Sequence, residues 1–195
     1  MTKSMTKSIL LVGVGGQGTI LASKLLTIGL MEKGYDVKMS EIHGMAQRGG
    51  AVSSQVRYGD EVQSPVIELG DADILVSFEK MEALRWLEYL KPEGSVIVND
   101  LEINSTPILN GVAEYPKDAI EEIEKTGVPV SVVNATVAAE ELGNPKIMNV
   151  VLLGATVKQM GLMDIDWEKI VRENVPEKLT EINVKALRKG IALIG

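Results

Sequence analysis

The chain has no cysteine. It can therefore form no disulfide, and it offers no thiolate to act as a nucleophile or to hold an iron–sulfur cluster. It also has a single histidine, His43, which argues against a histidine-rich zinc site. If the protein takes part in electron transfer, the metal centres must belong to another chain.

Positive charge and long apolar runs are also scarce. Twenty lysines and arginines stand against 27 aspartates and glutamates, for a net charge of −7, and the basic residues form no run. This balance argues against a nucleic-acid or anionic-membrane partner. The apolar run Ile9 to Val12 is too short for a signal peptide, and no stretch is long enough to span a membrane. We therefore expect a cytoplasmic protein.

The length of 195 residues and a hydrophobic content of 45% fit one α/β domain. The first eight residues repeat the tetrapeptide Met-Thr-Lys-Ser. We expect residues 1–7 to be a disordered tail and residues 8–195 to form a single domain.

Strand and helix patterns alternate along the chain, which predicts an α/β fold. We expect a Rossmann-like, mostly parallel sheet with helices on both faces, an inserted β-hairpin and a helical C-terminal region. The expected strands cover residues 8–12, 35–40, 73–78, 95–99 and 128–133. The expected helices cover residues 16–33, 79–90, 116–125, 135–142, 147–160, 166–174 and 176–194. The inserted hairpin is expected to join 51–58 to 61–67 through Gly59-Asp60.

Two of the expected helices are apolar on nearly every side. Residues 19–31 and 147–160 each contain one charged residue, Lys24 and Lys158. A helix of this kind is usually buried on both faces. Either the rest of this domain covers both faces, or a second subunit covers one of them.

A glycine-rich turn links the first strand to the first helix. It reads Gly13, Val14, Gly15, Gly16, Gln17 and Gly18. In a nucleotide-binding turn Gly13 permits the tight bend, Gly15 lets the backbone approach a phosphate, and Gly18 lets the helix pack on the strand. The helix N-terminus then attracts an anion. The confirming acid after the second strand is matched only loosely, by Glu41, so a tight turn that holds no nucleotide remains an alternative.

The segment after the second expected strand combines a histidine, glycines, an amide and a guanidinium. It reads His43, Gly44, Met45, Ala46, Gln47, Arg48, Gly49 and Gly50. Glycines allow close backbone approach, and the glutamine and arginine supply donors suited to carboxylate or phosphate. The alternative is a capping or core histidine. Because loops at strand ends often bind ligands, we predict a binding or interface role. No catalytic residue or metal ligand can be assigned.

Together, the segments 9–18 and 41–50 resemble the corresponding motifs in the gamma-type domain of 2-oxoacid:ferredoxin (acceptor) oxidoreductases. The resemblance to this family extends over nearly the whole chain. The histidine segment is the specific part of the resemblance. The resemblance implies a subunit of an enzyme complex that oxidatively decarboxylates an arylpyruvate such as indolepyruvate to an acyl-coenzyme A and reduces ferredoxin. The isolated chain is then expected to be inactive and to hold no cofactor alone.

The resemblance further implies a larger partner subunit with thiamine diphosphate, magnesium and iron–sulfur clusters, in an assembly of two larger and two smaller subunits. Coenzyme A is the implied co-substrate. The glycine turn and the His43–Gly50 segment are expected to face the subunit interface and the coenzyme A or substrate side. Two rival readings remain: a self-sufficient NAD- or flavin-binding Rossmann oxidoreductase, and a purely structural subunit whose loops dock a partner.

Overall fold

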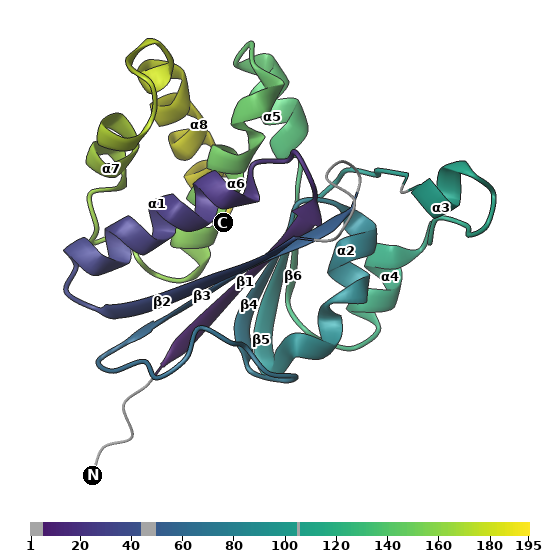
Figure 1. Ribbon diagram of the computed structural model, residues 1–195. Coiled ribbons are helices and arrows are strands. Elements are labelled where there is room, and N and C mark those ends of the chain that lie inside the picture. The colour runs from purple at the N-terminus through teal and green to yellow at the C-terminus, as the bar shows by residue number, and fades with distance from the viewer. Residues whose placement is uncertain (1–5, 44–49, 105) are drawn as a thin grey trace.

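A computed structural model describes residues 6–43, 50–104 and 106–195. Within them, six strands form one sheet in the order β2-β3-β1-β4-β5-β6 (Figure 1). The strands are β1 (Lys7–Val14), β2 (Asp36–His43), β3 (Ala51–Gly59), β4 (Ala72–Ser77), β5 (Leu90–Asn99) and β6 (Val130–Val133). Only β3 runs antiparallel to its neighbours. The prediction of a mostly parallel sheet is confirmed.

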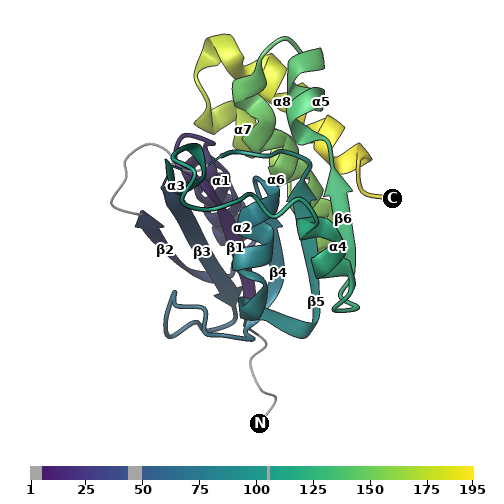
Figure 2. The same ribbon diagram turned by 90° about the vertical axis from the view of Figure 1, so that its right-hand side faces the viewer.

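Helices cover both faces of this sheet. They are α1 (Thr19–Glu32), α2 (Lys80–Arg85), α3 (Thr106–Leu109), α4 (Ala119–Glu124), α5 (Ala135–Glu141), α6 (Met148–Gln159), α7 (Trp167–Asn174) and α8 (Thr180–Ala192), with 3₁₀ helices η1 (Leu87–Tyr89), η2 (Pro145–Ile147) and η3 (Glu177–Leu179). Figures 1 and 2 show α1 and the helices α5 to α8 on one face, and α2 and α4 on the other. The predicted α/β architecture with a helical C-terminal region is confirmed.

The central strand β1 is buried on both sides. Ile9 and Leu11 belong to the core under α1 and α6, whereas Leu10 and Val12 belong to the core under α2 and α4. Each of the four side chains is at most 1% exposed. Burial on both faces explains why the strand is an uninterrupted apolar run rather than an alternating one.

The predicted hairpin partner of residues 51–58 is wrong. Strand β3 pairs along its whole length with β2 on one side and with β1 on the other, so both of its edges are occupied. The hairpin is therefore made by β2 and β3, and β3 separates β2 from β1. Residues 60–71 form no strand. Pro65, which has no N–H to donate to a ladder, lies in this loop.

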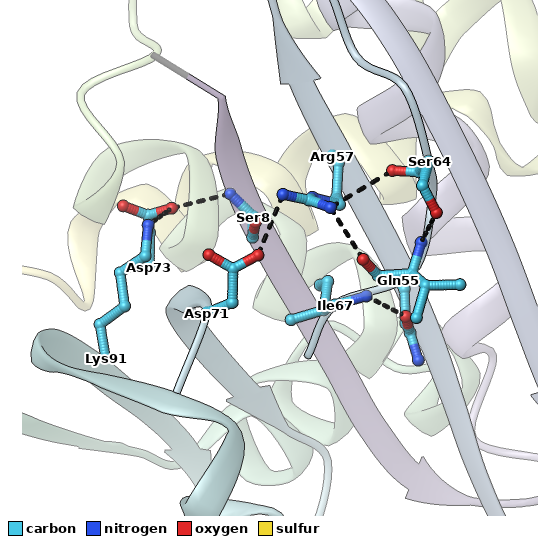
Figure 3. Close-up of polar contacts among 9 residues, drawn as sticks. Ser8, Gln55, Arg57, Ser64, Ile67, Asp71, Asp73 and Lys91 are labelled. Atoms are coloured by element: carbon cyan, nitrogen blue, oxygen red, sulfur yellow. Dashed lines mark hydrogen bonds and ion pairs between the residues drawn. The ribbon is translucent and has the colours of Figure 1, made fainter. Parts of the chain in front are cut away.

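The loop of residues 60–71 is instead fastened to the polar face of β3 (Figure 3). Arg57 donates from Nη1 to the carbonyl of Val66 at 2.8 Å, and its Nη2 lies 3.0 Å from Asp71. The Gln55 Oε1 accepts the backbone N–H of Ile67 at 2.7 Å. The polar side chains Gln55 and Arg57 of β3 therefore hold a loop that buries Ile67 against the core.

Several element boundaries also differ from the expected ones. The helix expected over 79–90 ends at Arg85 and is followed by η1. The strand expected over 95–99 begins earlier, at Leu90, with an irregularity where its register with β4 shifts. The short helix α3 lies between the expected strand 95–99 and the expected helix 116–125, where no element was predicted. Local turn residues mark the neighbourhood of a boundary, but pairing with an adjacent strand decides where it falls.

The domain itself covers the apolar helix α6. Residues 148–157 are all buried, and α6 packs against α1, α5 and α8. Helix α1 keeps two large apolar side chains exposed, Ile20 and Met31. Burial of α6 therefore needs no second subunit. Among the described residues, no helix is both long and apolar enough to cross a bilayer.

An ion cluster at the amino end of the sheet joins three strands (Figure 3). The Asp73 carboxylate lies 3.0 Å from Lys7 and 2.9 Å from Lys91, and it accepts the Ser8 N–H at 2.8 Å. Its side chain is only 13% exposed. Burial alone would raise the pKa of Asp73, but the bonds from Lys91, Lys7 and Ser8 hold that pKa below its usual value.

This cluster predicts a pH-dependent loss of stability. Replacing Asp73 with asparagine should lower the free energy of unfolding at pH 7 by about 2 kcal/mol, the order of a charge-assisted hydrogen bond. Because the folded-state pKa is depressed, the contribution of the carboxylate is complete above its unfolded-state pKa of about 3.9 and is lost as the pH falls through the folded value.

Urea unfolding of Asp73→Asn and the wild type between pH 7 and pH 2 measures this difference. Asp60→Asn, a change of an exposed residue, is the control. The destabilisation should shrink toward low pH. A destabilisation of constant size across this range would contradict the assignment.

Candidate functional site

The glycine turn lies at the carboxyl edge of the sheet, between β1 and α1. Gly16 and Gly18 have φ values of +101° and +82°, which L side chains rarely adopt. At Gly13 a Cβ atom would lie 2.6 Å from the Gln17 Oε1 and 2.8 Å from the Phe78 Cβ. The turn therefore requires glycine at three positions, for conformation at two of them and for space at the third.

The Gln17 side chain folds back over this turn. Its Oε1 accepts the Val14 N–H at 2.7 Å, and its Nε2 donates to the Phe78 carbonyl at 2.9 Å. The Gly15 N–H donates to the carbonyl of Gly50 at 2.9 Å. The Val14 and Gly15 amides are thus bonded within the protein. This differs from a dinucleotide cradle, in which the backbone at the second glycine closely approaches a phosphate.

A cavity of about 460 Å³ opens beside the turn. Its lining comes from four separate parts of the chain: Gly16, Gln17, Gly18, Leu101, Ile103, Thr136, Pro145, Lys146 and Met148. The N-terminus of α1 and the Lys146 amine give one part of it positive character. Leu101, Ile103, Pro145 and Met148 make the remainder apolar. Such a cavity suits an elongated ligand that carries both an anion and an apolar segment.

Two buried asparagines fix the walls of this cavity. The Asn149 Nδ2 on α6 donates to the Gly18 carbonyl at 3.1 Å. The Asn99 Nδ2 at the end of β5 donates to the Phe78 carbonyl at 3.2 Å and to the Thr136 Oγ1 at 2.9 Å. Neither asparagine was predicted to be a site residue, because an asparagine at a helix or strand end carries no distinguishing motif.

The structure describes only the two ends of the second predicted segment, His43 and Gly50. His43 is the last residue of β2, where its backbone pairs with Val52, and Gly50 accepts the hydrogen bond from Gly15. The predicted residues Gly44, Met45, Gln47, Arg48 and Gly49 lie outside the described residues. The structure therefore places Gly50, the end of this segment, directly against the glycine turn, as expected for two segments at one sheet edge.

Glu41, the loose match to a ribose-binding acid, lies on the α1 side of β2. Its Oε1 accepts a hydrogen bond from the Ser23 hydroxyl at 3.1 Å. The acid therefore ties the strand to α1.

Two buried carboxylates lie at the start of α2, Glu79 as its N-cap residue and Glu82 in its first turn. Glu79 accepts the Glu82 N–H and the Tyr115 hydroxyl, the latter at 2.7 Å, and so caps α2 and anchors the chain after α3. Burial raises the pKa of Glu82, although the nearby Arg85 and Trp86 oppose this. Burial also raises the pKa of Tyr115, and its hydrogen bond to Glu79 adds to the effect. These contacts assign the pair a role in holding this edge together.

The described part of the chain contains no group of three or more histidine, aspartate or glutamate residues placed to hold a metal ion. The sequence also offers no cysteine for a cluster. A chain without cysteine does not fit an iron–sulfur cluster, and the residues that the structure describes do not fit a magnesium–diphosphate site.

Comparisons with known proteins agree on one kind of enzyme. The model of the family "Pyruvate ferredoxin/flavodoxin oxidoreductase" matches residues 8–193. The indolepyruvate oxidoreductase subunit IorB of Pyrococcus horikoshii is 38% identical over 191 residues, which cover 94% of each chain.

Two solved structures share the fold. The gamma subunit of a keto/oxoacid ferredoxin oxidoreductase from Geobacter sulfurreducens matches with a TM-score of 0.70 and 25% identity, over 96% of this chain and 97% of that one. The pyruvate oxidoreductase subunit PORC from Thermotoga maritima matches with a TM-score of 0.74 and 25% identity, over 97% of both chains.

Proposed function

The chain belongs to the pyruvate ferredoxin/flavodoxin oxidoreductase family, and we propose that the sheet edge with its glycine turn binds coenzyme A during the oxidation of a 2-oxoacid. The chain is a subunit of a 2-oxoacid:ferredoxin oxidoreductase complex, and it carries no cluster of its own. Family membership implies larger partner subunits. The observation that carries the proposal is the cavity bounded by Gly16, Gln17 and Gly18, with Gly50 bonded to the same turn.

The proposed substrate is an arylpyruvate such as indolepyruvate, the acid named for the Pyrococcus relative. The reaction cleaves the bond between the oxo carbon and the carboxylate, releases carbon dioxide, and joins the acyl group to the sulfur of coenzyme A. Two electrons pass to two ferredoxins, and the thiol proton is released. Thiamine diphosphate, magnesium and iron–sulfur clusters would supply the decarboxylation and electron transfer from the larger subunit.

The residues of this chain would bind and orient coenzyme A. The N-terminus of α1 and the Lys146 amine would attract its phosphates. Leu101, Ile103 and Met148 would pack against the less polar part of the molecule and exclude water there. These roles extend the predicted glycine-turn site to walls that lie far away in the sequence.

We further propose that the His43–Gly50 segment meets the larger subunit at this edge. Arg48 would pair with a carboxylate or phosphate, Gln47 would position it, and His43 would act only at a site completed by the partner. The proposed assembly contains two larger and two smaller subunits.

The rival of a self-sufficient NAD- or flavin-binding enzyme is not favoured. The relatives that cover the whole chain are named as subunits of oxoacid:ferredoxin enzymes. Glu41 bonds to Ser23, and the Gln17 side chain takes the Val14 amide. Tight nicotinamide or flavin binding by the isolated chain would revive the rival.

Replacing Arg48 with alanine tests the proposed role of the second segment. The reconstituted complex should assemble, and its KM for coenzyme A or for the 2-oxoacid should rise about tenfold or more, because a charge-assisted hydrogen bond contributes about 1.5–3 kcal/mol. Steady-state kinetics with each substrate varied in turn gives both constants.

Arg172→Ala is the matched control, because Arg172 pairs with Glu181 on the exposed surface of α7 and α8. It should leave both constants unchanged. If Arg48→Ala changes neither assembly nor either KM, the role proposed for Arg48 is wrong. If Arg48→Ala prevents assembly but leaves both KM values unchanged in any complex that does form, a purely structural role is favoured.

A further inference from the structure

We propose that Asn99 is a positioning residue, which presets the cavity for coenzyme A through the carbonyl of Phe78 without touching the ligand. This inference rests on the proposed function, since it concerns the same cavity. It adds a residue that the glycine motif does not contain and that does not line the cavity.

The geometry places one buried carbonyl between two amide side chains. The Phe78 carbonyl accepts from the Gln17 Nε2 at 2.9 Å and from the Asn99 Nδ2 at 3.2 Å. The Gln17 Oε1 in turn accepts the Val14 N–H. The side chain of Asn99 is fully buried. The conformation of the glycine turn is therefore tied, through one carbonyl, to the end of β5.

The same amide also holds the opposite wall. The Asn99 Nδ2 donates to the Thr136 Oγ1 at 2.9 Å, and its Oδ1 accepts the Thr136 N–H at 3.3 Å. Asn134, the N-cap residue of α5, makes no side-chain capping bond, so Asn99 bonds a first-turn amide of that helix from another element. Of the two cavity-lining residues, Thr136 is thus bonded directly to Asn99, and Gln17 shares with Asn99 the carbonyl of Phe78.

This arrangement predicts an effect on affinity rather than on chemistry. Ordering a flexible cavity wall when the ligand binds reduces the net free energy of binding. A wall that is already ordered avoids this cost. Loss of the Asn99 amide should loosen Gln17 and Thr136 together. It should weaken coenzyme A binding and leave the steps at the partner subunit unchanged.

Kinetics of the reconstituted complex carrying Asn99→Ala test the proposal. The KM for coenzyme A should rise about tenfold, the effect expected of about one buried hydrogen bond. The KM for the 2-oxoacid and kcat should stay within twofold. In a Gln17→Ala background, Asn99→Ala should raise the KM for coenzyme A by a smaller factor than in the wild type, because only its bonds to Thr136 still contribute to the cavity.

Asn183→Ala is the matched control. Asn183 is also buried, and its Nδ2 donates to the Leu179 carbonyl at 2.8 Å, but it lies on α8 and does not line the cavity. It should reduce stability without changing the KM for coenzyme A. Equal effects of Asn99→Ala and Asn183→Ala on all three constants would overturn the positioning role, as would an additive effect of Gln17→Ala and Asn99→Ala.

A second measurement keeps the test independent of the ligand. Hydrogen exchange of the Val14 amide should accelerate in Asn99→Ala and stay unchanged in Asn183→Ala, in the full-length chain without coenzyme A. If Asn99→Ala does not fold well enough for kinetics, Thr136→Val removes the hydroxyl partner alone and should raise the same KM by a smaller factor. An unchanged KM would count against the proposal.

The two proposals can fail separately. If the wild-type complex turns over without coenzyme A, the proposed function is wrong, and the exchange of Val14 then decides whether Asn99 positions the turn. If coenzyme A is required and neither its KM nor the Val14 exchange responds to Asn99→Ala, the positioning role alone is wrong.

Discussion

Replacing Gly190 with alanine should lower the free energy of unfolding by about 3 kcal/mol, the upper range for inserting a methyl group into a packed core. A Cβ at this position would lie 1.8 Å from the Val151 carbonyl oxygen on α6. The facing Gly154 is equally crowded, since its Cβ would lie 2.2 Å from the Leu187 carbonyl on α8. The two helices thus touch through their backbones, and the neighbour cannot yield by a side-chain rotation.

Chemical denaturation of Gly190→Ala and the wild type measures this loss. Lys189→Ala is the control on the same helix, because Lys189 is exposed and pairs only with the exposed Glu141. It should change stability by no more than about 0.5 kcal/mol. If Gly190→Ala is as stable as the wild type, α6 and α8 do not pack as closely as described. A shift of α6 would also displace Met148 and Asn149, which lie at the cavity.

The second large effect is a complete dependence of turnover on both subunits. The isolated chain should oxidise no 2-oxoacid, because it has no cysteine for a cluster and no described cluster of acidic residues for a metal. The larger subunit alone should form no acyl-coenzyme A, because the proposed coenzyme A cavity belongs to this chain. Mixing the two should restore coupled turnover.

The parts of the fold that depend on local sequence could be predicted. Gly34 has a φ of +97° just after α1, as expected for a glycine that ends a helix. The glycine turn lies between the first strand and the first helix, where the motif places it. The uninterrupted apolar run of β1 indicated a strand buried on both faces.

The parts that depend on distant pairing could not be predicted in this way. Alternation over 51–58 correctly indicated a strand, but it contains no information on whether the partner precedes or follows it in sequence. The nearest turn, Gly59-Asp60, suggested the following segment, and the structure uses the preceding one. The polar side chains of β3 bind the backbone of the loop around Ile67. Hydrophobic periodicity does not encode such contacts between side chains and a distant backbone segment.

The candidate site could be predicted only in part, because it too depends on contacts between distant parts of the chain. Gly16, Gln17 and Gly18 form one wall of the cavity, and the glycine spacing of the turn identified them. Leu101, Thr136 and Lys146 are brought to the cavity by β5, α5 and η2, and each is unremarkable in its own stretch of sequence. Gln17 was noted as part of the turn, but its inward hydrogen bonds depend on Phe78, which is 61 residues away.

One measurement tests the central claim most directly. The chain is co-expressed with the larger subunit, and reduction of ferredoxin is followed with an arylpyruvate, with and without coenzyme A, beside each subunit alone. We expect reduction of ferredoxin only when both subunits, the arylpyruvate and coenzyme A are present together. One molecule of acyl-coenzyme A should form for every two ferredoxins reduced. Turnover by this chain alone, or turnover by the pair that does not depend on coenzyme A, would contradict the account.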